Sequence, residues 1–346
     1  MLYIVLFFTF FSFFLYVLLG GADFGAGIIE LFASPKDKET ARNISYRVLG
    51  PVWEVNHIWL IILIVILWVA FPGYFNVIMI YLHLPFVLIL LGITLRGVAF
   101  IFRHYDAVVD RSQVLYNWMF RISSFITPIF LGMSFGALIG GEIIITEDYA
   151  GYSFFEIFID PWLNYFTLLV GLFYATLCAF MASTLLIGET QGEARKMFSR
   201  KSANYTLLLV IIGLILVAYG YFTEVEFILD FITNPVSIGA IVLSAILLIP
   251  LWKSIRKQNR IWSRWLAGIQ VVLVLFAAIY AHFPYIIITS EKELSLLEGV
   301  APDEVISNLA IMLIIGGAVI LPGLFHLMRS FNMIKILEKE KEEMKP

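Results

Sequence analysis

The chain has 346 residues, of which 61% are hydrophobic and only 14% are charged. Soluble domains carry about 25% charged residues, so this composition predicts an integral membrane protein. The net charge of −3 provides no basic excess for nucleic acid, and the single cysteine, Cys178, excludes an internal disulfide and a cysteine-cluster metal site.

Nine stretches of the chain are apolar and long enough to cross a membrane as helices, which takes about 20 mostly apolar residues. They cover residues 4–32, 48–71, 74–102, 114–141, 162–187, 204–222, 236–252, 263–288 and 304–328. Short polar connections separate them, and the alternation typical of a membrane barrel is missing. We therefore expect an all-α integral membrane protein that forms a single polytopic domain over residues 1–346.

Charged residues in the connections alternate in sign. The first, third, fifth and seventh connections and the C-terminal tail carry most of the 23 lysine and arginine residues, whereas the fourth and sixth connections are acidic. Because cationic loops are retained in the cytoplasm, we expect the N-terminus outside the cell and the C-terminus in the cytoplasm.

A weak internal repeat relates the two halves of the chain. Residues 4–32 and 162–187 run in the same predicted direction, and each stretch holds small residues near its cytoplasmic half. Internal repeats are common in membrane proteins. We interpret residues 1–141 and 162–288 as two four-helix bundles, followed by one extra helix at residues 304–328.

An acidic residue, Asp23, lies in the run GGADFGAG at residues 20–27. Glycines in a span let another helix approach closely, so the acid is expected to be buried against protein. Two interpretations stay open: a tight helix contact in which Asp23 is hydrogen-bonded locally, or a role in handling protons. Glu30, nearer the end of the same span, is expected to be a solvated interfacial residue.

Glu54 and His57 lie three residues apart in the second predicted span and therefore share a helix face. A charge in hydrocarbon costs roughly 2.5–3.5 kcal/mol on insertion scales, so such an acid needs a partner, a proton or water. Glu54 is predicted either to relay protons or to form a static salt bridge with Arg96 or Arg121. For His57, a structural hydrogen bond is as plausible as proton transfer.

The chain has five histidines that a haem or metal could use in principle. His83 is predicted near mid-membrane and is the best haem candidate, because a haem in a helical bundle needs facing axial ligands. We nevertheless expect each histidine to be a core or interfacial residue. The five are His57, His83, His104, His282 and His326.

Motifs for self-contained chemistry are missing from the sequence. No phosphate-binding loop, nucleophilic triad or metal-ligand spacing appears, and no metal site is predicted. Trp53, next to Glu54, is expected to shield the acid from lipid or to contact a quinone ring. The sequence therefore favours a channel, a carrier, or a subunit whose chemistry lies in a partner.

Two motifs in a fixed order resemble a known family. The run GADFGAG at residues 21–27, followed by GPVWEVNHIWL at residues 50–60, resembles subunit II of cytochrome bd-type quinol oxidases. The run LRGVAF at residues 95–100 and the later pair Phe283-Pro284 match the same family. The resemblance covers essentially the whole chain.

The resemblance implies a subunit of a heterodimeric terminal oxidase that oxidises a quinol and reduces O₂ to water. In that family the haem-bearing subunit I holds haems b and d, so this chain is expected to bind no haem. Some members hold a structural quinone in subunit II, and Trp53 and Arg96 are the candidate contacts for a quinone or for the partner subunit. The expected location is the lipid of a prokaryotic inner membrane.

The resemblance also implies a proton pathway made of Glu54, Asp23 and His57. In the family, an acid after the tryptophan of the second helix is implicated in delivering cytoplasmic protons toward the haems, and Glu54 matches it by position. Asp23 matches the acid of the glycine motif. Many members have Asp at the position of Glu54 and Gln at the position of His57. The alternatives are a proton-coupled secondary transporter and a purely structural scaffold for a haem-bearing partner.

Overall fold

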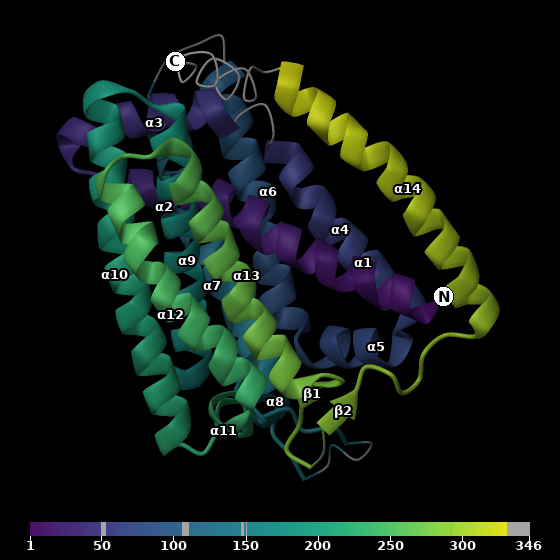
Figure 1. Cartoon of the computed structure of the whole chain (residues 1–346). Coiled ribbons are helices and arrows are strands. Elements are labelled where there is room, and N and C mark those ends of the chain that lie inside the picture. Colours follow the sequence, from purple (N-terminus) through teal and green to yellow (C-terminus); the bar gives the residue numbers. More distant parts are fainter. Residues whose placement is uncertain (50–52, 106–110, 147–148, 150, 292, 331–346) are drawn as a thin grey trace.

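The structure, a computed structural model, describes residues 1–49, 53–105, 111–146, 149, 151–291 and 293–330. Within these ranges, the side chains of residues 49, 53, 54, 104, 105 and 327–330 lie outside the description. The described chain is helical apart from one short hairpin (Figure 1). Its elements, including one π-helical segment (η1), are α1 (Leu2–Leu15), η1 (Tyr16–Gly20), α2 (Gly21–Leu31), α3 (Pro35–Leu49), α4 (Trp53–Ala70), α5 (Pro72–Tyr81), α6 (His83–Tyr105), α7 (Ser112–Ile139), α8 (Phe154–Phe158), α9 (Tyr165–Glu189), α10 (Gly192–Phe222), α11 (Glu226–Thr233), α12 (Pro235–Arg256), α13 (Arg260–His282), β1 (Tyr285–Ile288), β2 (Glu293–Ser295) and α14 (Asp303–Ser330).

The spans confirm the predicted all-α membrane architecture. Among the described residues, eight helices are long and apolar enough to cross a membrane, and the bent pair α4–α5 makes a ninth when it is counted as one span. The orientation of the termini, the internal repeat and the division into two four-helix bundles stay predictions.

The first span is a single 30-residue helix composed of α1, η1 and α2. It crosses the molecule obliquely, from the N-terminus to α2 in the upper half of Figure 1. Between Tyr16 and Gly20 the backbone is π-helical, and such irregular turns inside α-helices occur frequently at functional sites. The buried Asp23 lies three residues after the end of this π-helical segment.

Helix α9 is the most deeply buried of the described spans, and α2, α7, α10 and α13 pack against it. Close approach depends on glycines of α2. A Cβ at Gly25 would overlap the backbone carbonyl of Cys178 in α9, and one at Gly27 would overlap Ser124 in α7. Lipid tails are as apolar as leucine, so this tight packing, rather than hydrophobic burial, stabilises the bundle.

The chain turns sharply between α4 and α5, whose axes differ by 115°. Phe71 adopts φ −129° and ψ 58°, and Pro72 begins α5. A residue that precedes proline is driven out of the α region, which ends α4 here. The predicted span 74–102 is therefore wrong in its first third, because the spanning helix α6 begins only at His83. His83 thus lies at a helix end and not near mid-membrane.

The predicted span 263–288 is too long at its C-terminal end. Helix α13 ends at His282, and Pro284 has no N–H group with which to continue it. Residues 285–288 instead form β1, which pairs antiparallel with β2. The sequence showed no alternation strong enough to predict a hairpin of this length.

One tyrosine joins this hairpin to α5. The Tyr74 hydroxyl accepts hydrogen bonds from the backbone N–H groups of Ile286 and Ile287, at 3.0 and 3.2 Å. It also donates to the Leu294 carbonyl. Because this uses the full capacity of the hydroxyl, Tyr74 fixes the hairpin against the corner of the α4–α5 turn.

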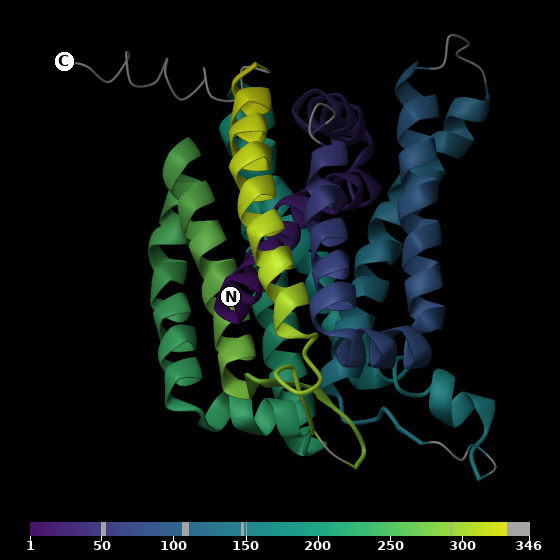
Figure 2. The same cartoon turned by 90° about the vertical axis from the view of Figure 1, so that its right-hand side faces the viewer.

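Helix α14 lies at the periphery of the molecule. It contacts α1 and α4. Figure 1 shows it standing at one side of the main bundle, and Figure 2, viewed from that side, draws it in front of the other helices. Beneath it lies an apolar pocket whose walls include Phe8, Trp59 and Ile62 on one side and Gly316 and Gly317 on the other. The two glycines leave space there that larger side chains would fill.

Candidate functional site

A buried ion pair links α2 to α6. Arg96 Nη1 lies 2.5 Å from Asp23 Oδ2, and Arg96 Nη2 donates to the Asp23 backbone carbonyl at 2.9 Å. Arg96 Nε donates to Ser124 Oγ of α7 at 2.9 Å. Asp23 is 1% exposed and Arg96 2% exposed. The hydrogen bonding expected for Asp23 is present. Its partner is Arg96, which was expected to pair with Glu54 or to contact a quinone or the partner subunit.

A second buried cluster lies farther along α2. Glu30 Oε2 accepts from Arg103 at 2.6 Å, and Glu30 Oε1 accepts from Arg121 at 2.8 Å. Glu30 is 1% exposed, so the expectation of a solvated interfacial residue is wrong. Two guanidinium groups, one from α6 and one from α7, balance the negative charge of Glu30 and donate the hydrogen bonds that water would otherwise donate.

The two clusters repeat with the same spacing on both helices. Asp23 and Glu30 are seven residues apart on α2, and Arg96 and Arg103 are seven residues apart on α6. Seven residues make about two helical turns, so each pair of residues shares one face of its helix. The matched order shows that α2 and α6 run parallel. This spacing was visible in the sequence, although nothing there paired the two helices.

Aromatic rings surround the guanidinium groups. The Phe120 ring lies 4.9 Å from the Arg96 guanidinium carbon and 4.8 Å from that of Arg103, and Phe24 lies 5.2 Å from Arg96. A cation over an aromatic face is attracted by the ring quadrupole, more strongly where water is excluded. Phe120 therefore lies between the two buried clusters and stabilises both. We call these clusters the two ion-paired layers: one contains Asp23 and Arg96, and the other contains Glu30, Arg103 and Arg121.

A narrow cavity runs beside both layers. Its lining includes Asp23 and Glu30 from α2, and Arg42 and Ser45 from α3. Ser45 Oγ is buried and has no hydrogen-bond partner among the described residues. Polar walls with an unpaired hydroxyl are suited to binding a single water molecule beside the ion pairs.

His57 of α4 lies beside the Asp23–Arg96 ion pair and is the third member of that layer. Its Nε2 lies 3.7 Å from Asp23 Oδ2, which is too long for a hydrogen bond. The ring contacts Tyr16 and Phe24, at centroid distances of 6.1 and 5.6 Å. Its Nδ1 is buried and has no hydrogen-bond partner among the described atoms. His57 is therefore the member of this layer whose hydrogen bonds remain open.

Three of the predicted site residues, Asp23, His57 and Arg96, meet in one place. Glu54 and Trp53 begin α4 one turn before His57, but their side chains lie outside the description. The two arginines that were considered as partners of Glu54 are bound instead to Asp23 and Glu30. The roles predicted for Glu54 and Trp53 stay predictions.

The remaining described histidines lie elsewhere. His83 Nδ1 bonds to the Ile80 carbonyl at 2.8 Å. His282 is buried at the end of α13, and His326 is exposed on α14. The side chain of His104 lies outside the description.

Comparisons with known proteins agree on one family. A model of the family "Cytochrome bd terminal oxidase subunit II" matches residues 1–331. A Bacillus subtilis (strain 168) protein named "Cytochrome bd ubiquinol oxidase subunit 2" is 28% identical over 281 residues, which is 79% of this chain and 77% of that protein. An Escherichia coli (strain K12) protein named "Cytochrome bd-I ubiquinol oxidase subunit 2" is 27% identical over 207 residues, or 58% of this chain and 52% of that protein.

A solved structure shares the fold. A chain in the bd oxidase from Geobacillus thermodenitrificans superposes with a TM-score of 0.76 at 19% identity, covering 95% of this chain and 98% of that chain. The two chains therefore share one fold.

Proposed function

The chain belongs to the family of cytochrome bd terminal oxidase subunit II, and from that premise we propose that it delivers cytoplasmic protons to the oxygen-reducing chemistry of a partner subunit. As a member of this family it is a multi-pass membrane subunit of a quinol oxidase complex. The partner proposed here is the haem-bearing subunit I with haems b and d, and the substrates of the complex are a quinol and O₂.

The observation that supports proton delivery is the open hydrogen bonding of His57. Its Nδ1 is buried without a partner among the described residues, and its Nε2 lies 3.7 Å from the Asp23 carboxylate. An imidazole can accept a proton at one nitrogen and release one from the other. The Asp23 carboxylate stabilises the protonated ring that this exchange forms.

The other residues have distinct roles in this proposal. Arg96 is a positioning residue, because its hydrogen bonds to Asp23 and Ser124 hold the carboxylate in place. Glu54 precedes His57 by one helical turn on α4 and takes up the proton first. The cavity beside Asp23 and Ser45 brings water to the same layer.

Substitutions of Glu54 and His57 in the intact complex test the proposal. We expect Glu54→Gln to lower quinol-driven O₂ consumption by about tenfold or more, since positioned acid–base groups contribute about 10²–10⁴-fold. The solvent deuterium isotope effect on turnover should rise, because proton transfer becomes limiting. The haem content per complex should stay unchanged.

Two further variants separate proton transfer from packing. His57→Leu removes both ring nitrogens and should lower turnover, whereas His57→Gln keeps a hydrogen-bonding group and should retain more of it. His83→Gln is the matched control, because His83 also lies at the start of a helix but outside this layer. Wild-type turnover in Glu54→Gln with an unchanged isotope effect would refute the relay and leave a structural role.

We also propose that the apolar pocket beneath α14 holds a structural quinone. Trp59 lines this pocket, and its Nε1 is buried without a hydrogen-bond partner among the described residues. An indole N–H can donate to a quinone carbonyl. Trp59→Phe should reduce the quinone that is extracted per complex by several-fold, while Trp262→Phe, an exposed tryptophan on α13, should not change it.

A further inference from the structure

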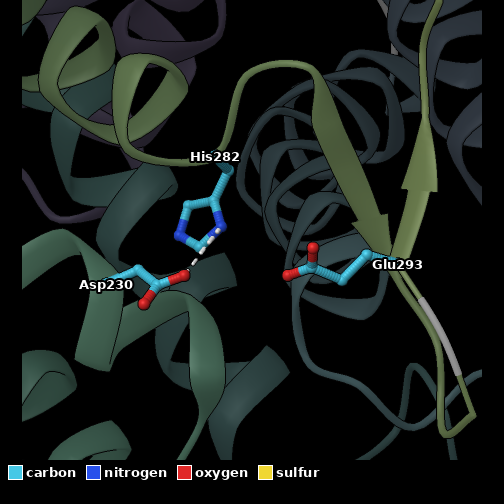
Figure 3. A group of neighbouring side chains, drawn as sticks. All are labelled: Asp230, His282 and Glu293. Carbon is cyan, nitrogen blue, oxygen red and sulfur yellow. Dashed lines mark ion pairs between the residues drawn. The ribbon is translucent and has the colours of Figure 1, made fainter.

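Three potential metal ligands meet at one edge of the molecule, away from the ion-paired layers. Asp230 comes from α11, His282 ends α13, and Glu293 begins β2. One ligand atom from each lies within 4.8 Å of the other two. Figure 3 shows the two carboxylates pointing toward the imidazole ring from different elements. Because 52 residues separate Asp230 from His282, no short sequence motif could reveal this group.

The orientation of the His282 ring is fixed from two sides. Its Nε2 lies 3.0 Å from the Phe227 carbonyl, and its ring stacks on the Phe227 ring at 4.1 Å with 12° between the planes. A carbonyl only accepts, so Nε2 is the protonated nitrogen of the neutral ring, and Nδ1 carries the lone pair. A histidine whose second nitrogen donates to a carbonyl is the usual arrangement for a metal ligand.

The Nδ1 lone pair faces negative charge. Nδ1 lies 3.8 Å from Asp230 Oδ2, beyond hydrogen-bonding distance. The His282 side chain is 2% exposed, and it is Nε2, not Nδ1, that makes the hydrogen bond to the Phe227 carbonyl. A lone pair beside carboxylates is a position that a proton or a metal ion can occupy.

We propose that Asp230, His282 and Glu293 form a binding site for a divalent transition-metal ion of the Zn²⁺ class. One imidazole nitrogen and two carboxylate oxygens suit this ion, and water takes the fourth position of a tetrahedral site. Ligand atoms around such an ion lie about 3.4 Å apart, so the three groups move together by about 1 Å on binding. Asp230 is free to move, because its side chain is 50% exposed.

The ion joins three elements, of which α11 and α13 are already linked by the contact between Phe227 and His282. It ties α11 and α13 to the β1–β2 hairpin, and the hairpin is already attached to α5 through Tyr74. All of these lie at the end of the molecule drawn at the bottom of Figure 1. The site therefore closes this end of the helical bundle, on the face predicted to lie outside the cell.

Zinc binding to the purified complex tests the proposal. The detergent-solubilised oxidase is treated with EDTA, titrated with ZnCl₂, desalted and analysed by mass spectrometry, with haem iron as the internal standard. We expect saturable binding of one zinc ion per complex. X-ray absorption at the zinc edge should show only nitrogen and oxygen ligands. Zn²⁺ should also raise the melting temperature of the wild-type complex.

Isosteric variants identify the site. Asp230→Asn and Glu293→Gln should each weaken zinc binding at least tenfold and abolish the melting shift, without changing haem content. Glu298→Gln is the matched control, because it removes an exposed carboxylate just after β2. The proposal would be overturned by a lack of saturable zinc binding, by wild-type zinc affinity in both variants, or by displacement of zinc by equimolar Ca²⁺. None of these readouts depends on oxidase turnover, so the result is independent of the proton-delivery proposal.

Discussion

Two groups of acidic side chains in the described part of this protein face different kinds of partner. Asp23 and Glu30, each 1% exposed, are bonded to arginines from α6 and α7. Asp230 and Glu293, at the edge, face the histidine His282. A carboxylate in the interior must receive its cation from the chain itself, because hydrocarbon supplies none. At the edge, a cation can arrive from solution.

The largest effect is expected when the arginine that pairs with a buried carboxylate is removed. Arg96→Met leaves Asp23 buried and uncompensated, and breaking a buried pair costs about 3–5 kcal/mol. We expect the yield of intact complex, measured as haem absorbance in the size-exclusion peak, to fall severely. The double variant Asp23→Asn with Arg96→Met should recover part of the yield, because no lone charge remains. An unchanged yield in the single variant would contradict the account.

A smaller effect is expected where α2 meets α9. Gly25→Val places a side chain against the backbone of Cys178, and overpacking of this kind costs about 1–3 kcal/mol. The melting temperature of the complex should drop. Gly73→Val is the control, since a Cβ at Gly73 meets no atom within 4 Å. Equal melting temperatures for the two variants would show that close contact at Gly25 is unimportant.

Phe120 tests how far aromatic contacts stabilise the buried arginines. Its ring serves both Arg96 and Arg103, and a desolvated cation–π contact contributes about 2 kcal/mol. Phe120→Leu keeps an apolar side chain and should lower stability by about 1–2 kcal/mol in thermal unfolding. Phe102→Leu, at an exposed aromatic residue on the same helix as the two arginines, should change it little. The account fails here if the two substitutions have the same effect.

The smallest effect is expected at the edge. Without added metal, Asp230→Asn should change stability by only about 0–1 kcal/mol, as for other exposed charges. The measurement is thermal unfolding of the EDTA-treated complex, compared with wild type. A loss as large as that of Arg96→Met would mean that both groups are structural ion pairs, and the contrast between interior and edge would disappear.

Much of the fold was predictable because spans leave long apolar runs. The errors occur where a local feature ends a helix inside such a run. Pro72 follows Phe71 in continuous apolar sequence, and the resulting 115° corner cannot be recognised from hydropathy. The end of α13 at His282 is similar, because the strand that follows is as apolar as the helix.

Individual residues of the candidate site could be predicted from the sequence, but their interaction partners could not. Asp23 and His57 stood out as polar residues in apolar spans, yet the partner of Asp23 lies 73 residues away. Glu30 was misjudged because its position near a helix end suggests solvent. The helix packing that brings Arg103 and Arg121 to it is a tertiary property. The meeting of Asp230, His282 and Glu293 at the edge is likewise a tertiary property that the sequence does not reveal.

The central claim is that protons reach the oxygen chemistry through Glu54 and the His57 layer. Proton uptake during a single turnover tests this claim most directly, with the fully reduced complex mixed with O₂ in the presence of a pH-indicator dye. We predict that Glu54→Gln slows proton uptake about tenfold or more while the initial binding of O₂ keeps its wild-type rate. Proton uptake at the wild-type rate in this variant would contradict the account.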